Sequence, residues 1–108
     1  ISTEEQNYLN KLVNNIYRNL ALEENINNEK KHNQIILDLK KFNAQNVVIK
    51  RKIVLYTIRK VYGNTNNIAK IHIDDIIKMC EKNIGNKYLT PHKNIKVYVK
   101  KGKIFFMA

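Results

Sequence analysis

The stretch "NIKVYVKKGKIFFMA", residues 94–108, contains two runs of alternating apolar and polar residues joined by Lys101 and Gly102. Alternation with a period of two is typical of strands that bury one face, and a two-residue connection ending in Gly is typical of a tight β-hairpin. This turn sets the register of the two strands. It pairs the apolar residues of one side as Val99 with Ile104, Val97 with Phe106 and Ile95 with Ala108.

The other side of this hairpin brings Tyr98 opposite Phe105 and surrounds the two rings with Lys96, Lys100 and Lys103. Aromatic rings can stack on unpaired bases while ammonium groups hold phosphates, so the pattern favours an RNA-binding surface. The same pattern equally suits rings that pack under a helix or against another domain. Both interpretations stay open from the sequence alone.

Upstream of the hairpin, residues 3–24 carry apolar side chains at helical spacing, and Ser2 and Glu5 have the spacing of a capping box. A polar loop, residues 25–33, is expected next. Residues 34–39, "QIILDL", then form a short apolar run rich in branched side chains, which predicts a strand.

Two more helices are expected between this strand and the hairpin. One covers residues 44–62 and ends at Gly63, which is suited to a left-handed cap. The other covers residues 70–84 and ends at Gly85. The order is therefore helix, strand, helix, helix, hairpin, which predicts a small single α+β domain of about three helices with a short strand and a C-terminal hairpin.

The length of 108 residues suits one domain, with a leading helix over 1–24 and a helix–hairpin body over 34–108. The chain begins with Ile1 rather than Met, so we expect a fragment of a longer protein. An acidic amino terminus and the lack of a long apolar run predict a cytoplasmic protein without a membrane span. The single cysteine, Cys80, agrees with a reducing compartment.

Charge is unevenly distributed along the chain, whose net charge is +11. Residues 1–29 hold two basic and five acidic residues, residues 30–60 hold nine and one, and residues 61–108 hold nine and three. An AT-rich genome would explain lysine in place of arginine, but not the shortage of acids. Such an imbalance predicts an acidic partner, with nucleic acid as the first candidate.

The expected helix 44–62 has an apolar arc with Arg51 near its middle, while Lys52, Arg59 and Lys60 lie on the far side. An arginine in such an arc extends its head to the solvent-exposed rim, pairs with a carboxylate such as Asp38, or contacts an anionic ligand, and we favour the structural pair over the ligand. The far-side charges are either a solvated face or phosphate contacts. The residues predicted to bind nucleic acid are Lys40, Lys41, Lys50, Lys52, Arg59, Lys60, Lys96, Tyr98, Lys100, Lys101 and Lys103.

No catalytic residue and no metal ligand is predicted. His72 and Cys80, with the other two histidines, show no zinc-type spacing, and Asp74 and Asp75 are explained as first-turn helix charges. His72 is assigned a structural place at the start of its helix. The sequence also lacks a P-loop and a GxGxxG motif.

Read in order, the segments resemble a known family. They are the strand and basic helix "IILDLKKFNAQNVVIKRKIVLYTIRKVYG", the helix opening "KIHIDDIIKM", the turn "YLTP" and the "VYV…IFF" hairpin. This set resembles the domain that follows the PP-loop catalytic domain in tRNA(Ile)-lysidine synthase. The basic helix of that family carries an Arg, which falls on Arg51, and the next helix a His, which falls on His72. The family turn "LdLPnG" is altered here, because its second Leu and its Gly are both absent.

The resemblance implies an ATP-dependent ligase that attaches lysine to the wobble cytidine of an isoleucine tRNA. The adenylating "SGGxDS" motif of the family is absent from this chain, so the fragment is expected to be inactive alone and to need no cofactor. ATP and Mg²⁺ would belong to the catalytic domain of the same chain. The expected partners are that domain and tRNA.

Two other functions are weighed. A basic protein-interaction or scaffold module, with lysines that only solubilise it, is the main alternative. A helix-based DNA binder is disfavoured because the helix after the loop "GNTNN" opens with Asp74 and Asp75 rather than with base-reading side chains.

Overall fold

The computed structural model describes residues 3–27 and 32–108 and has four helices and five strands within them. The helices are α1 (Thr3–Leu20), α2 (Leu39–Asn43), α3 (Val47–Tyr62) and α4 (Lys70–Lys82). The strands are β1 (Ala21–Asn25), β2 (Gln34–Asp38), β3 (Tyr88–His92), β4 (Ile95–Lys100) and β5 (Lys103–Met107). The predicted α+β fold class, including the C-terminal hairpin, is confirmed.

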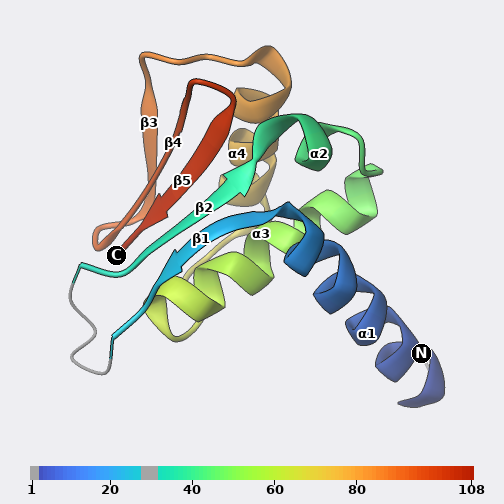
Figure 1. The fold of residues 1–108 in the computed structure, drawn as a ribbon. Coiled ribbons are helices and arrows are strands. Elements are labelled where there is room, and N and C mark those ends of the chain that lie inside the picture. Colours follow the sequence, from blue (N-terminus) through green and yellow to red (C-terminus); the bar gives the residue numbers. More distant parts are fainter. Residues whose placement is uncertain (1–2, 28–31) are drawn as a thin grey trace.

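All five strands belong to one antiparallel sheet in the order β1-β2-β5-β4-β3. Figure 1 shows α3 and α4 on one side of this sheet and α1 extending away from it, with β1 and β3 at its two edges. Side chains that alternate along a strand point to opposite faces. One face of the sheet therefore packs on the helices, and we call the other the open face.

The hairpin has the predicted turn and register. Lys101 and Gly102 both have positive φ, at 49° and 75°, which is the backbone of a type I′ turn. Val97 pairs with Phe106 and Val99 with Ile104, and all four side chains are fully buried. Ile95 is also buried, and the paired part of β4 and β5, in the predicted register, ends one step before it, at Lys96 and Met107.

The prediction of one helix up to Glu24 is wrong, because α1 ends at Leu20 and Ala21–Asn25 form β1. Ala, Leu and Glu favour a helix locally. As a strand, however, these residues pair with β2, whose backbone would otherwise form an exposed edge of the sheet. Ser2 of the expected capping box, and residues 28–31 of the expected loop, lie outside the described residues.

The helix predicted over 44–62 begins at Val47, and "LKKFN" before it forms the short helix α2, which was not predicted. The Asn46 side chain accepts a hydrogen bond from the Ile49 N–H and so caps the start of α3. Gly63, at φ 109°, ends α3 as predicted. The cap of α4 was predicted wrongly, because Asn83 takes the left-handed conformation two residues before Gly85.

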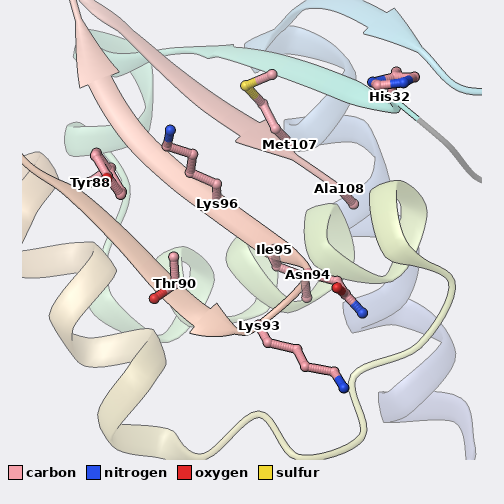
Figure 2. Close-up of a pocket in the computed structure, with 9 residues that line it drawn as sticks. All are labelled: His32, Tyr88, Thr90, Lys93, Asn94, Ile95, Lys96, Met107 and Ala108. Carbon is pink, nitrogen blue, oxygen red and sulfur yellow. The ribbon is translucent and has the colours of Figure 1, made fainter.

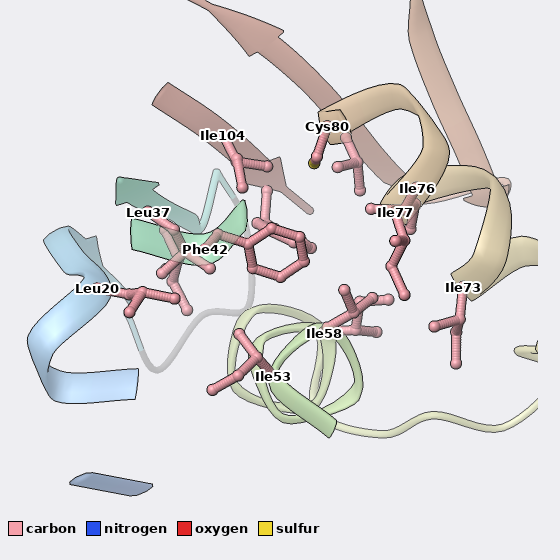
Figure 3. Close-up of a cluster of buried hydrophobic side chains, with 14 of the residues drawn as sticks. Leu20, Leu37, Phe42, Ile53, Ile58, Ile73, Ile76, Ile77, Cys80 and Ile104 are labelled. Atoms are coloured by element: carbon pink, nitrogen blue, oxygen red, sulfur yellow. The ribbon is translucent and has the colours of Figure 1, made fainter. Parts of the chain in front are cut away.

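An apolar core fills the space between the sheet and the helices, as Figure 3 shows. Phe42 of α2, Ile58 of α3 and Ile76 of α4 meet Leu37 and Ile104 of the sheet there, and each of these side chains is fully buried. Burial of one such side chain contributes about 1.5 to 3 kcal/mol to folding. The core thus fixes the sheet with its open face turned away from all the helices that pack on it.

Candidate nucleic-acid interface

Aromatic side chains form a row across the open face. The register places Phe105 of β5 beside Tyr98 of β4, and Tyr98 beside Tyr88 of β3. The rings of Tyr98 and Phe105 stack with centroids 4.7 Å apart and planes 4° apart. Ile36 of β2 extends the row and is almost buried. Tyr88, on the edge strand, is 58% exposed.

Lysines gather where the hairpin turns. Lys100 lies directly opposite Lys103, with Lys101 in the turn between them, although like charges placed opposite each other destabilise a strand pair. The Leu39 N–H at the start of α2 donates to the Gly102 carbonyl at 3.0 Å, which brings α2 beside the turn. We call the five exposed lysines here the basic end: Lys40, Lys41, Lys100, Lys101 and Lys103.

Little acidic charge opposes the basic end. Asp38 of β2 lies opposite Lys103, but its Oδ1 accepts a hydrogen bond from the Lys41 N–H at 2.9 Å and caps α2. Residues 82–108, which include β3, β4 and β5, contain seven lysines and no Asp or Glu. The part of the open face formed by β3, β4 and β5 therefore carries a field that attracts anions, whereas exposed Glu23 of β1 lies at the opposite edge.

A hollow of about 430 Å³ opens beside the aromatic row, between β3, β4 and the end of β5. Figure 2 shows its lining, with Tyr88 and Lys96 next to each other and the ammonium of Lys93 extending away from them. The Lys96 Nζ lies 4.0 Å from the centre of the Tyr88 ring, which is a cation–π contact. We call this feature the β3–β4 hollow; its polar lining includes Tyr88, Thr90, Lys93, Asn94 and Lys96.

The predicted basic residues of α3 do not join the open face. Lys52 and Arg59 are exposed beside α1, on the helical side of the molecule. Lys60 donates to Glu24 at 2.9 Å, and its ammonium lies 4.9 Å from the Tyr17 ring centre. The structure thus separates the candidate residues into two groups on different layers.

Lys50 does not belong to an exposed basic strip, contrary to the sequence prediction. The residue is 7% exposed, and its ammonium pairs with Glu81 at 3.3 Å and lies 5.9 Å from the Phe42 ring centre. Its stem packs in the core, so the ammonium cannot reach a phosphate on an approaching nucleic acid without leaving this position. Beside it, burial raises the pKa of Cys80 to about 12, so this thiol stays protonated.

Arg51 forms an ion pair, but not with the predicted partner. Its Nε lies 3.1 Å from Oδ1 of Asp74 on α4, and both side chains are about one third exposed. Asp38 is instead occupied by the α2 cap. A partly exposed pair of this kind contributes about 1 kcal/mol or less to stability.

The histidines have local structural contacts. The Ala69 N–H donates to Nδ1 of His72 at 3.0 Å at the start of α4, and the His92 ring lies 5.1 Å from the Tyr62 ring. Within residues 3–27 and 32–108, no group of three or more His, Cys, Asp or Glu side chains is placed to hold a metal ion.

Sequence reasoning missed Tyr88, Thr90 and Met107 as part of the open face. "YLTP" was interpreted as a turn because of Pro91, whereas it forms the edge strand β3, where a proline is tolerated. The aromatic and β-branched residues before the proline were the available signal for a strand. In the part of the chain that the structure describes, no helix is long and apolar enough to span a membrane.

The fold and this face together define a small α+β domain with a lysine-framed aromatic sheet surface. No protein-family model matches the chain. The chain is 32% identical over 79 residues to the tRNA(Ile)-lysidine synthase of Clostridioides difficile (strain 630). The match covers 73% of this chain but only 17% of that relative, so the chain corresponds to a small part of it. The resemblance predicted from the sequence is thereby confirmed.

Proposed function

We propose that the chain binds tRNA through its open face and basic end and positions it for a lysidine-forming ligase. The chain has a net charge of +11, and the similarity to a tRNA(Ile)-lysidine synthase supports tRNA as the acidic partner. Lysine contacts to phosphates fix the position and orientation of a nucleic acid without reading its sequence.

One observation carries this proposal: Lys100 and Lys103 face each other across the hairpin, next to Lys101, on two strands, β4 and β5, that contain no acid. This arrangement costs folding stability through repulsion. An anionic ligand with closely spaced phosphates would relieve the repulsion, so the cost is explained if the surface has such a ligand. The aromatic row beside the lysines favours RNA over a simple anion.

The ligase activity is proposed for the longer parent protein and not for this chain alone. The chain has no "SGGxDS" motif, and we assign adenylation, with its ATP and Mg²⁺, to a PP-loop domain of the same protein. In this arrangement the domain described here holds the body of the tRNA while the catalytic domain acts on the anticodon. The catalytic domain is then the second partner.

A protein-docking module is the competing candidate, and the apolar centre of the open face favours it. Ile36, Tyr98 and Phe105 form a continuous apolar row that could pack against another domain. Docking of this kind would depend on these three side chains and would be insensitive to the lysines around them.

The first prediction compares two triple variants with equal charge change. Lys100, Lys101 and Lys103 are replaced by Gln in one, and Lys11, Lys52 and Arg59, which are exposed on α1 and α3, in the other. The first variant should bind tRNA more weakly and lower the slope of log affinity against log salt by about 0.7 to 0.9 per lost phosphate contact. The second should keep most of the affinity and the slope, as measured by fluorescence anisotropy over a salt series.

Equal losses of tRNA affinity in the two variants would mean that binding depends only on net charge. The assignment of tRNA binding to the open face would then be wrong. Absence of tRNA binding by the unmodified chain at low salt would contradict the proposed function itself.

A further inference from the structure

We infer that the β3–β4 hollow is a binding site for one unpaired nucleotide, whose base stacks on Tyr88 and whose phosphate is held by Lys96. This inference rests on the proposed function, and it adds the class of ligand: a single-stranded or flipped-out nucleotide rather than a base-paired stem.

Tyr88 is the ring of the aromatic row with a free surface. Tyr98 and Phe105 cover each other because their planes are parallel at 4.7 Å. Tyr88 is 58% exposed, and it lines both the β3–β4 hollow and a smaller one of about 230 Å³ on the side of α4. A base can therefore reach this ring without any change in the backbone.

The two hollows that meet at Tyr88 differ in the charge of their lining residues. The smaller hollow includes Asp75, which repels a phosphate. Among the described residues, those that line the β3–β4 hollow include no acid, and they include Lys96, whose ammonium already lies 4.0 Å from the Tyr88 ring centre. A lysine side chain is flexible, so the ammonium can move from the ring to an incoming phosphate while the base takes its place.

The shape and the polar lining suit a single nucleotide. A volume of about 430 Å³ lies in the range of sites for small molecules. Thr90 contributes a hydroxyl and Asn94 an amide to the lining (Figure 2), and such groups hydrogen-bond to base edges or to a ribose 2′-hydroxyl. Bases inside a duplex are stacked and paired, so their faces are not available to stack on the Tyr88 ring.

The test uses a tryptophan reporter, because the chain contains no Trp. Tyr88→Trp places one indole in the hollow, and Tyr8→Trp places one on α1, where Tyr8 is 71% exposed and far from the open face. The probes are a twelve-nucleotide oligouridylate and a twelve-base-pair RNA duplex. We expect the single strand to quench the fluorescence of Tyr88→Trp saturably, and to leave that of Tyr8→Trp nearly unchanged.

Affinity measurements complete the test. Tyr88→Ala should weaken binding of the oligouridylate about tenfold, with little effect on the duplex, because stacking of one base is lost. Tyr88→Phe keeps an aromatic ring, so it should keep the affinity of the unmodified chain for the oligouridylate. Lys96→Met should weaken both probes and lower the salt slope by about one contact. Thermal melting of each variant shows that it is folded.

Equal quenching of both reporters would overturn the nucleotide site. So would an equal loss of affinity for the single strand and for the duplex on Tyr88→Ala. If the charge variants at the basic end still lose tRNA affinity in that case, the proposed function survives without this site. Displacement of the oligouridylate by polyglutamate at matched charge would also overturn the inference, because the hollow would then select charge and not bases.

Discussion

Lys50 shows that the charge of a residue alone does not predict whether it is exposed. It lies in the run "KRK", and its neighbour Lys52 is exposed, yet Lys50 itself is buried against Phe42 with its ammonium on Glu81. Helical periodicity would have placed it beside the apolar arc, so the signal was present but was outweighed by the basic run. For Arg51, the predicted pairing with a carboxylate is confirmed, and the carboxylate is that of Asp74 rather than that of Asp38, the example named from the sequence.

The second prediction concerns the energy of this buried lysine. Lys50→Met should change the free energy of unfolding by less than about 1 kcal/mol, because Met fills the space of the stem and removes the cost of desolvating an ammonium. Glu81→Ala should cost about 1 to 2 kcal/mol, because it leaves the ammonium unpaired; the half-exposed position of Glu81 keeps this below the cost for a fully buried pair. Urea denaturation of both variants gives the comparison. A larger loss for Lys50→Met than for Glu81→Ala would mean that the lysine itself stabilises the fold.

At the scale of elements, the helices and strands that could be predicted from the sequence are those with strong local patterns. The hairpin turn and the end of α3 were predictable because positive φ favours glycine, which stands at Gly102 and at Gly63. The edge strands β1 and β3 were not, because "ALEEN" favours a helix and "YLTPH" contains a proline. Both become strands only because β2 and β4 offer them a partner, and such long-range pairing has no local signature.

The third prediction tests what holds β1 against the helices. Glu24 of β1 accepts hydrogen bonds from Tyr17 of α1 and Lys60 of α3. Burial acts to raise the pKa of Glu24, but these two hydrogen bonds outweigh it and hold the pKa below its ordinary value of 4.5. The unfolded chain therefore binds a proton more readily than the folded chain, so this contribution to stability is present above about pH 4.5 and is lost as the pH falls through the folded pKa.

The measurement is thermal melting of the unmodified chain and of Glu24→Gln between pH 3 and pH 7. The variant should be less stable near neutral pH, and the difference from the unmodified chain should shrink as the pH is lowered. A difference that stays constant over this range would show that the charge of Glu24 is not what ties β1 to α1 and α3.

At the scale of the whole molecule, the structure is two-sided. The helices and one face of the sheet build the core, and the open face is left with aromatic side chains, a hollow and lysines. The sequence predicted half of this candidate interface, since Tyr98, Lys96, Lys100 and Lys103 follow from the hairpin alone. Tyr88 and the hollow could not be predicted, because they exist only where β3 joins β4. The placement of Lys52 and Arg59 on the opposite layer likewise depends on packing between helices and sheet.

The central claim is that nucleic acid binds the open face and not the helical layer, and chemical-shift mapping tests it most directly. Titration of the ¹⁵N-labelled chain with tRNA should shift the backbone amides of β3, β4 and β5 and of the start of α2, with Tyr88, Lys96 and Gly102 among the largest changes. The amides around Lys52 and Arg59 on α3 should move little. Shifts confined to α1 and α3, with the sheet unperturbed at saturating tRNA, would contradict the account.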